Sequence, residues 1–380
     1  MSVTGSSVRR INLVQLGVGL IGCTTIEQVL DHRARWQREL GLDLVYRGLI
    51  DFDGAVACDQ ADGYSESTLR RVIEARKQRR GLAEAAPEFG LTPRQGNEAL
   101  DIATSFGPTI VMDTAVGEGT AELDAQALSA GAGLVFSNKA PFAMPHGTPV
   151  GDAIWACAGP LGLVRYETTC GAGLPVISTL RSLIDTGDEV IEIVGALSGT
   201  FGAIFSDVAN GKPFSAAVRS AKEQGYTEPD PRDDLSGLDV ARKALILART
   251  MGRRVDLSEL EIENLVPEAM RGLSVDDFLA RASALDAAMA ERAAEAKARG
   301  KALKYVATVR PDGPIAVGLR AIGKETVLGA LQGPENIISF RTKRYDAYPL
   351  NVTGPGAGAA VTAAGVVADV LALATGPLGS

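Results

Sequence analysis

The chain has only two histidines, His32 and His146, among its 380 residues. Neither is flanked by a nucleophile signature, so the sequence does not indicate a Ser-His or Cys-His mechanism. The four cysteines contain no C-x-x-C pair and have no neighbouring histidine that would complete a zinc set. Proton transfer must therefore fall to Lys, Asp, Glu or Tyr, and the cysteines are expected to be thiols in a reducing compartment.

Long apolar runs and basic runs are also missing. A net charge of -8 and a pI near 5.1 argue against nucleic acid as a partner. The densest cationic run, residues 76–80, closes a helix-like stretch, and we interpret it as a solvated face. No apolar run reaches membrane-spanning length and no apolar segment precedes the first predicted strand, so we expect a cytoplasmic protein that does not enter a membrane.

The overall composition is that of a folded protein of more than one domain. Hydrophobic residues make up 46% and charged residues 22% of the chain, close to the soluble average. At 39.6 kDa the chain exceeds what one hydrophobic core usually organises. We therefore expect two domains, or one domain with a large insertion.

A glycine turn stands near the start of the chain. The apolar run 10–16 leads into "GVGLIG" (17–22), a helix-like segment follows to about residue 40, and a second apolar run stops at Asp51. Gly17 would allow the tight turn, Gly19 would let a pyrophosphate approach the backbone, and Gly22 would let helix and strand pack closely. Asp51 lies 29 positions past Gly22, more than the usual spacing of about 20, which predicts a long first helix.

This strand, turn and helix order predicts a dinucleotide site, in which Leu20 and Ile21 of the turn also take part. An acidic residue at the end of the second strand suits a ribose 2'-hydroxyl and repels a 2'-phosphate, which slightly favours NAD over NADP. A turn that serves packing alone is the alternative.

Two further strands are followed by polar loops. "PTIVMDTAVGEG" (108–119) and "GLVFSNKAPFA" (133–143) are separated by a helix-like segment, a pattern typical of a parallel sheet. Ligands bind at the carboxyl ends of such strands, so we expect Thr114, Ala115, Asn138 and Lys139 to line the cofactor crevice. The alternative for Lys139 is a surface lysine in a turn.

After about residue 165 the pattern changes. Residues 276–302 predict one charged-faced helix, and short alternating runs between 303 and 352, "TVLGAL" among them, predict antiparallel strands. The chain closes with a second glycine-rich turn that opens a helix. The fold class is therefore α/β: a Rossmann-type doubly wound parallel sheet over residues 1–165, completed by the helix 353–376, plus an α+β domain over 166–352.

The stretch "GYTEPDPRDDLSGLDVARK" (225–243) concentrates charge. Its prolines exclude helix around them, and Ser236 or Asp234 is predicted to cap a helix that carries Asp239 and Lys243 at i and i+4, on one face. By spacing alone this is a common surface ion pair worth about 0.3–0.5 kcal/mol. Because the helix is apolar on most sides, Lys243 is expected at a partly buried cleft, as an acid/base for a carbonyl oxygen.

This stretch strongly resembles the signature of homoserine dehydrogenases. The motifs "GVGLIG", "SNKAP", "ETTCGAGLP", "ALSGTFGAIF" and "GPGAGAAVTA" follow the order seen in that family, over roughly residues 10–375. The resemblance implies reversible NAD(P)-dependent interconversion of L-homoserine and L-aspartate 4-semialdehyde, in threonine and methionine biosynthesis. It also implies a homodimer formed through the strands between 303 and 340, so that 166–352 is a catalytic and dimerisation domain.

The resemblance also assigns roles to single residues. Lys243 and Asp239 are the acid/base pair that contacts the substrate, and Lys139 lies between nicotinamide and substrate. Glu228 holds the substrate ammonium, with Asp234 also in the substrate set. The remaining assignments are cofactor contacts at Gly225 and Gly356, and a monovalent cation (Na or K) held largely by main-chain carbonyls at Glu167, Cys170, Ala172 and Leu174.

Two alternatives remain. One is another two-domain dehydrogenase that acts on a different small amino or hydroxy acid, and the other is a non-catalytic dinucleotide-sensing or scaffold protein. Aspartate-semialdehyde dehydrogenase would need a nucleophilic cysteine with a basic partner, which none of the four cysteines offers. Only "TGPLGS" follows the last predicted helix and no kinase-sized segment precedes the first strand, so we expect no threonine control through such domains.

Overall fold

The computed structural model describes residues 8–159 and 161–378 and divides the chain into two compact units. Unit 1 comprises Met1–Gly173 and Gly358–Ser380, and unit 2 comprises Leu174–Ala357. The expected boundaries, after residue 165 and before residue 353, therefore differ from these. The difference arises because the turn after residue 165 packs on the last helix: the backbone N–H of Glu167 donates to the Asp369 carboxylate at 2.9 Å.

Unit 1 is built on a mainly parallel sheet. Among the described residues this sheet has seven strands in the order β4-β3-β2-β1-β5-β6-β7. The strands β2, β1, β5, β6 and β7 run parallel, and β3 and β4 form an antiparallel edge. Their bounds are β1 (Arg9–Leu16), β2 (Leu42–Asp51), β3 (Gly54–Ala57), β4 (Pro93–Arg94), β5 (Thr109–Asp113), β6 (Gly133–Phe136) and β7 (Val164–Arg165).

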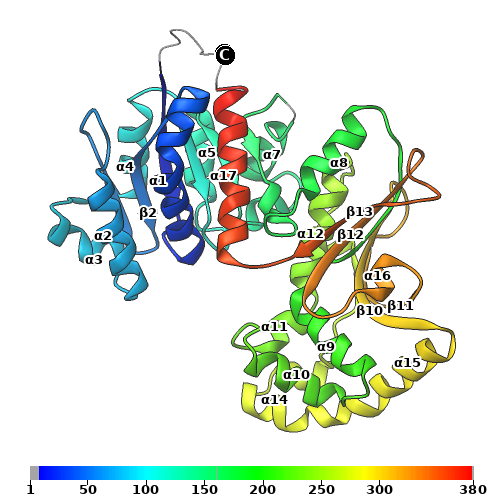
Figure 1. Ribbon diagram of the computed structural model, residues 1–380. Helices are drawn as coiled ribbons and strands as arrows, with labels where there is room; N and C mark the ends of the chain where they lie inside the picture. Colours follow the sequence, from blue (N-terminus) through cyan, green and yellow to red (C-terminus); the bar gives the residue numbers. More distant parts are fainter. Residues whose placement is uncertain (1–7, 160, 379–380) are drawn as a thin grey trace. The chain divides into compact units, whose positions relative to one another are not determined.

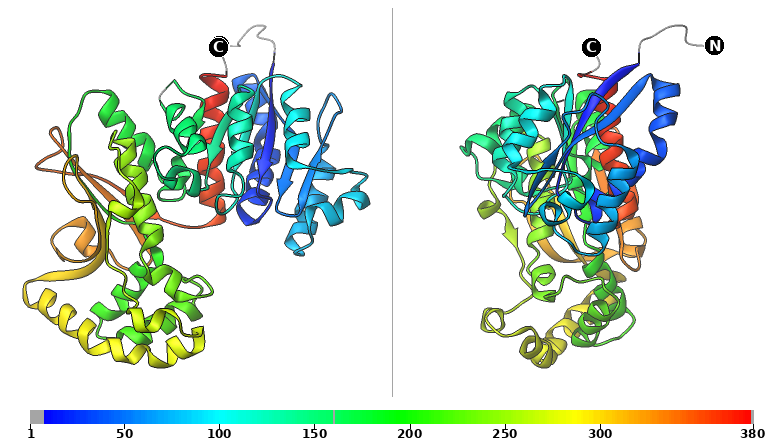
Figure 2. Two further views of the ribbon diagram at one scale, coloured as in Figure 1. Left: turned by 180° about the vertical axis from the view of Figure 1, so that it is seen from behind. Right: turned by 90° about the vertical axis from the view of Figure 1, so that its left-hand side faces the viewer.

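Helices cover both faces of this sheet (Figure 1). Figures 1 and 2 show α1 beside the last helix, α17, and these two helices pack on each other on one face. Helices α4 and α5 pack together on the other face, as right-handed crossovers require. The bounds are α1 (Leu20–Leu40), α2 (Glu66–Lys77), α3 (Leu82–Ala85), η1 (Ala86–Phe89), α4 (Gly96–Thr104), α5 (Ala121–Ser129), α6 (Ala140–Ala143), α7 (Pro149–Ala156), η2 (Glu167–Thr169) and α17 (Ala359–Thr375).

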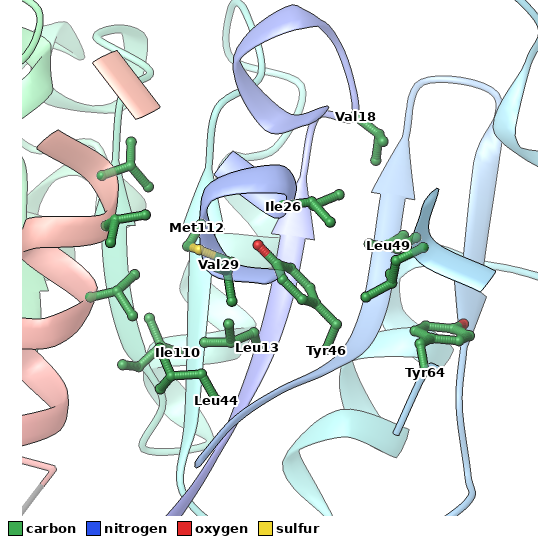
Figure 3. Packing of buried hydrophobic residues seen from close by; sticks show 14 of the residues in the cluster. Leu13, Val18, Ile26, Val29, Leu44, Tyr46, Leu49, Tyr64, Ile110 and Met112 are labelled. Atoms are coloured by element: carbon green, nitrogen blue, oxygen red, sulfur yellow. The ribbon is translucent and has the colours of Figure 1, made fainter. Parts of the chain in front are cut away.

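The core of unit 1 lies between the sheet and the α1/α17 face. Figure 3 shows Leu13 and Ile110 on neighbouring strands against Ile26 and Val29 of α1. The strands are buried on both faces, which explains why β1 and β2 read as continuous apolar runs rather than as alternating ones. This arrangement confirms the predicted doubly wound sheet and leaves the carboxyl ends of β1, β2, β5 and β6 at one edge.

Unit 2 is built on a mostly antiparallel sheet. In the described part of the chain it has six strands in the order β13-β12-β8-β10-β11-β9. Helices α9 and α12 pack on one face, where Phe201 stacks on Tyr305 with ring centroids 3.8 Å apart. Val306, Leu328 and Ile337 form a small cluster where α16 covers the opposite side. This unit is the predicted α+β domain.

The unit 2 strands are β8 (Val190–Ala196), β9 (Glu261–Ile262), β10 (Lys301–Val309), β11 (Ala316–Gly323), β12 (Glu335–Thr342) and β13 (Leu350–Pro355). Its helices are α8 (Val176–Asp185), α9 (Gly199–Ala209), α10 (Phe214–Glu223), α11 (Pro231–Leu235), α12 (Leu238–Thr250), η3 (Leu257–Glu259), α13 (Glu268–Arg271), α14 (Val275–Arg281), η4 (Ala282–Leu285), α15 (Asp286–Ala298) and α16 (Val327–Ala330). No helix in the two described ranges is both long enough and apolar enough to span a bilayer.

Three local predictions in unit 2 are wrong. "TVLGAL" contains helix α16, which Thr326 caps by accepting from the Gly329 N–H at 3.0 Å. The single helix expected over 276–302 is broken into α14, η4 and α15, and its last residues belong to β10. The prolines at 229 and 231 do not exclude helix, because Pro231 occupies the first position of α11, where a missing N–H costs nothing.

Candidate functional site

The glycine turn between β1 and α1 leaves the backbone open to a ligand. Gly17 has a φ of 79°, and a Cβ there would lie 2.7 Å from the Ala115 nitrogen, so only glycine fits. A Cβ on Gly22 would lie 2.0 Å from the Gly17 carbonyl oxygen, whereas one on Gly19 would meet nothing within 4 Å. These are the three requirements of a pyrophosphate turn: a tight bend, an approachable backbone and close helix packing.

The helix that follows the turn points its N-terminus at this open backbone. Leu20 is the first residue of α1 and is 74% exposed, and Ile21 follows it partly buried. The N–H groups of such a first turn have no intrahelical acceptor and favour an anion. At 21 residues α1 is long, which accounts for the wide spacing between Gly22 and Asp51.

Asp51 ends β2, as predicted, but its carboxylate is already paired. Arg76 of α2 lies 2.5 Å from Asp51 Oδ2, and its Nε donates to the Val18 carbonyl of the glycine turn at 3.0 Å. Both side chains are largely buried, so the interpretation of Arg76 as a solvated residue is wrong. A cavity of about 570 Å³ adjoins this strand end and is lined by Asp51, Phe52, Arg94 and Gly96 among others.

The loops after β5 and β6 lie beside the glycine turn. The Thr114 N–H donates to Leu16 O at 2.9 Å, and its hydroxyl donates to Gly17 O at 2.9 Å. Asn138 is buried, and Lys139, half-buried, is the N-cap residue of α6. The structure therefore brings Gly17, Thr114 and Ala115 together at the carboxyl edge of the sheet.

Lys243 lies on α12 in unit 2 and is buried. Its side chain is 10% exposed, its Nζ lies 2.8 Å from Asp239 Oδ2, and it donates to the Leu197 carbonyl at 2.6 Å. Asp239 sits one helical turn earlier with its side chain half exposed. The cap of α12 differs from the prediction: Gly237, with a φ of 76°, is the N-cap residue, because Ser236 and Asp234 belong to the preceding turn.

A second carboxylate cluster stands next to this pair. Asp234 Oδ2 accepts from the Glu228 N–H at 2.8 Å, and its Oδ1 lies 2.8 Å from the Thr200 hydroxyl. Burial raises the pKa of Asp234, the negative charges of Glu228 and Asp239 raise it further, and the two hydrogen bonds oppose the shift. The carboxylates of Glu228, Asp234 and Asp239 thus lie near one another, and a bound cation would reduce the repulsion between them.

The two remaining glycines predicted as cofactor contacts lie in unit 2 loops. Gly225, with a φ of 74°, ends the turn after α10 and has open space where a Cβ would stand. Gly356 follows β13, and a Cβ there would lie 1.9 Å from the Asn336 amide nitrogen, so the loop passes too close to β12 for any side chain.

The turn after β7 carries the predicted cation ligands. Ala172 has a φ of 54°, a left-handed conformation that an L-residue adopts only under local constraint, and Gly171 before it has a φ of 90°. Cys170 is fully buried. Glu167, Cys170 and Ala172 belong to unit 1, and Leu174 begins unit 2. Within residues 8–159 and 161–378, no three His, Cys, Asp or Glu side chains are grouped for a metal, so such a site would depend on carbonyls.

Sequence reasoning missed several residues of these two locations. Arg76 belongs to a cationic run and Thr200 to the segment "ALSGTF", and neither context singles the residue out. Leu197 takes part only through its carbonyl, which any residue has. The one available signal was that Thr200 and Leu197 flank the start of a helix just after a strand. Their partners, Asp234 and Lys243, lie more than thirty residues away in the chain.

The fold and these two locations define a class. A doubly wound sheet with an open glycine turn, joined in one chain to an α+β unit with a buried Lys-Asp pair, is typical of a two-domain, dinucleotide-dependent oxidoreductase.

Comparisons with known proteins identify the family. The family model for homoserine dehydrogenase matches residues 175–371. A homoserine dehydrogenase of Paracoccidioides brasiliensis is 40% identical over 289 residues, which cover 72% of this chain and 76% of that protein. The chain therefore belongs to the homoserine dehydrogenase family, whose members are NAD(P)-dependent oxidoreductases that act on a CH–OH group.

Two further relatives show the extent of the likeness. The chloroplastic bifunctional aspartokinase/homoserine dehydrogenase 2 of Arabidopsis thaliana is 36% identical over 376 residues, which cover 95% of this chain but only 38% of that protein. The chain thus spans well under half of this plant relative. The crystal structure of a Candida auris protein of unknown function superposes with a TM-score of 0.83 at 30% identity, covering 96% of this chain and 98% of that one.

Proposed function

We propose that this chain is a homoserine dehydrogenase that interconverts L-homoserine and L-aspartate 4-semialdehyde with NAD(P), in threonine and methionine biosynthesis. The observation that carries the proposal is the buried Lys243, held by Asp239 and by the Leu197 carbonyl beside the Glu228/Asp234 cluster. Family membership supports the same reaction.

The carboxylate cluster suits an amino-acid substrate. Glu228 is exposed, and the raised pKa of Asp234 reflects burial and the neighbouring charges of Glu228 and Asp239. An ammonium group bound there would relieve that repulsion, whereas a substrate without a cation would gain nothing from it. We assign the main contact with the substrate ammonium to Glu228. The negative charges of Asp234 and Asp239 add to the attraction of the ammonium.

Proton transfer is assigned to Lys243. In the reductive direction its ammonium donates a proton to the oxygen that gains charge, and Asp239 keeps the lysine charged and oriented. The Leu197 carbonyl fixes the direction of the Nζ group. Lys139 adds positive charge near the same oxygen, by resemblance to the family lysine. The bound dinucleotide supplies the hydride acceptor or donor.

The chain's residues fit a dinucleotide, because the glycine turn has the open backbone and close helix packing that a pyrophosphate needs. We assign Gly17, Gly19, Leu20, Ile21 and Gly22 to the pyrophosphate. Asp51 is assigned to the ribose, Thr114, Ala115 and Lys139 to the nicotinamide end, and Gly225 and Gly356 to further backbone contacts.

We propose that NAD is slightly preferred over NADP. The Asp51 carboxylate repels a 2'-phosphate, but Arg76, 2.5 Å from it, offsets much of that charge. An arginine at this place is also the group that accommodates a 2'-phosphate. Both cofactors are therefore expected to be used, and the balance between Asp51 and Arg76 decides the ratio.

Three further assignments stay proposals. The left-handed Ala172 supports a monovalent cation held by carbonyls of the turn Glu167, Cys170, Ala172 and Leu174. The strands of unit 2 between 303 and 340 are the expected homodimer surface. The four cysteines are thiols, which suits the cytoplasm.

The test is an initial-rate measurement with L-homoserine against NAD and NADP, each with and without sodium or potassium. We expect homoserine-dependent reduction of both cofactors, with a higher rate when the cation is added. If the cofactors are not reduced with homoserine but are reduced with another small hydroxy acid, the chain is a dehydrogenase with a different substrate, and the proposal is wrong.

A further inference from the structure

Asp113 is a buried carboxylate that has no part in the proposed mechanism. It is the last residue of β5 and is 1% exposed. Its Oδ1 accepts from the Ala115 N–H at 2.9 Å, and its Oδ2 accepts from the Thr120 hydroxyl at 2.7 Å and from the Asn138 amide at 2.9 Å. One side chain therefore joins the loop after β5 to the loop after β6.

The main chain of Asp113 strengthens this junction. Its carbonyl accepts from the N–H groups of Ser137 at 2.8 Å and Asn138 at 3.2 Å. Five hydrogen bonds thus converge on one residue, and three of them come from residues 137 and 138. The carbonyl of Asp113 thus holds the backbone of the second loop, and its carboxylate holds the Asn138 side chain.

The Asn138 side chain, held by Asp113, in turn holds the backbone on either side of Lys139. Its amide nitrogen also donates to the Gly117 carbonyl at 2.7 Å, and its Oδ1 accepts from the Ala140 N–H at 3.1 Å. Lys139 lies between Asn138 and Ala140, so its backbone is fixed on both sides by the same asparagine. Asp113 in turn orients that asparagine, because an ionised carboxylate only accepts and selects the amide NH₂ over the amide oxygen.

Asp124 of α5 explains how a buried charge is tolerated here. It is 0% exposed, and its carboxyl group lies within hydrogen-bonding reach of the Asp113 carboxylate, so a bond between the two requires a proton on one of them. Burial, followed by the charge of Asp113, raises the pKa of Asp124 well above its ordinary value. Burial also raises the pKa of Asp113, but hydrogen bonds from Thr120, Ala115 and Asn138 oppose that shift. The three hydrogen bonds that Asp113 accepts favour its charged form, whereas no described N–H or hydroxyl donor stabilises a charge on Asp124.

We propose that Asp113 is a positioning residue: its carboxylate sets the backbone of Lys139 through Asn138 and of Ala115 directly. The inference deepens the proposed function, since it gives Lys139 and Ala115 their places at the dinucleotide edge of unit 1. It is carried by hydrogen bonds within that unit alone.

Two near-isosteric substitutions separate this role from simple packing. Asp113→Asn puts an NH₂ group where an oxygen accepts, opposite the Asn138 amide or the Ala115 N–H. We expect kcat to fall about 10- to 100-fold, as misplacement of a reacting group by up to an ångström does, and the KM for dinucleotide to rise. Asp124→Asn keeps a hydrogen-bond donor beside Asp113 and is expected to keep kcat within about threefold of the unsubstituted protein.

Hydrogen exchange on the full chain gives a readout that does not depend on turnover. In Asp113→Asn the amides of Ala115 and Ala140 should exchange faster than in the unsubstituted chain, while Asp124→Asn should leave them unchanged. Equal loss of kcat and equal exchange in both variants, or normal kcat in Asp113→Asn, would overturn the proposal. If the unsubstituted chain fails to oxidise homoserine, the proposed function falls, but exchange and NAD binding in the two variants still decide the positioning role.

Discussion

Replacing Lys243 by methionine tests the proposed acid/base chemistry most directly. Methionine keeps much of the volume of the lysine stem but removes the ammonium, and with it the 2.8 Å contact to Asp239 and the hydrogen bond to Leu197 O. A positioned general acid contributes about 10²- to 10⁴-fold to rate. At 1.36 kcal/mol per tenfold, this corresponds to about 2.7–5.4 kcal/mol of transition-state stabilisation.

The same change has a smaller cost in folding stability. The Leu197 carbonyl loses a donor in a buried place, which costs about 1–3 kcal/mol. Asp239 loses its cation, but its side chain is 49% exposed and water can solvate it. We therefore expect Lys243→Met to be folded, with a modestly lower midpoint of thermal unfolding.

Unit 2 offers a matched control in Lys304. Both lysines are 8% exposed, and Lys304 Nζ also donates to a backbone carbonyl, that of Leu331. Lys304→Met therefore reproduces the loss of a buried lysine and of one hydrogen bond away from the proposed site. Burial lowers the pKa of Lys304, because removal from water disfavours the charged ammonium.

The assay is the initial rate of cofactor reduction at saturating L-homoserine, together with NAD binding by fluorescence and a thermal scan. We expect Lys243→Met to lose kcat at least about 10²-fold with NAD affinity within about twofold, and Lys304→Met to keep kcat. The reasoning is refuted if Lys243→Met turns over at a near-normal rate, or if both variants lose activity to the same degree.

Three other outcomes are expected. Glu228→Gln should raise the KM for homoserine about tenfold with little change in kcat, because a binding contact of about 1.4 kcal/mol is lost; an unchanged KM places the ammonium elsewhere. Arg76→Ala should lower kcat/KM for NADP more than for NAD, since the cation beside Asp51 is removed; equal losses contradict the assignment. Burial raises the pKa of Asp369 to about 7, above its value of about 4 in the unfolded chain, so stability is lost as pH rises between these values. Asp369→Asn keeps an acceptor for the Glu167 N–H. Its free energy of unfolding in urea, relative to the unsubstituted protein, should therefore increase by about 2–3 kcal/mol from pH 5 to pH 8. A difference that does not change with pH contradicts the raised pKa of Asp369.

The parts of the fold that depend on local pattern were predictable from the sequence. The glycine turn, the long α1 and the strand ending in Asp51 follow from residue order, because a steric need for glycine and a continuous apolar run are local properties. The pairing of Asp239 with Lys243 was predictable for the same reason, since residues four apart on a helix face one another.

What failed depended on tertiary contacts. "TVLGAL" has the β-branched and apolar residues of a strand, yet it forms α16, because it packs on Val306 and Ile337 of the sheet rather than pairing with an edge. Arg76 looked solvated in a run of cations, and only the fold brings it to Asp51, 25 positions earlier in the chain. Asp113 gave no signal, because its partners are backbone groups, the Thr120 hydroxyl and an asparagine of the next strand unit.

The charged stretch 225–243 divides into two parts that differ in how their charge is balanced. Arg232 binds Asp230 at 2.6 Å and donates to the carbonyls of Arg271 and Leu273, and its hydrogen bond lowers the pKa of Asp230. In that part the charge of Asp230 is balanced by Arg232, which also ties the loop to residues 271–273. Burial, and then the charges of Glu228 and Asp239, raise the pKa of Asp234. Among the described residues only Asp239 of these three carboxylates has a cation partner, Lys243. We therefore propose that the remaining charge of Glu228 and Asp234 binds a positive group supplied from outside, such as the ammonium of an amino acid.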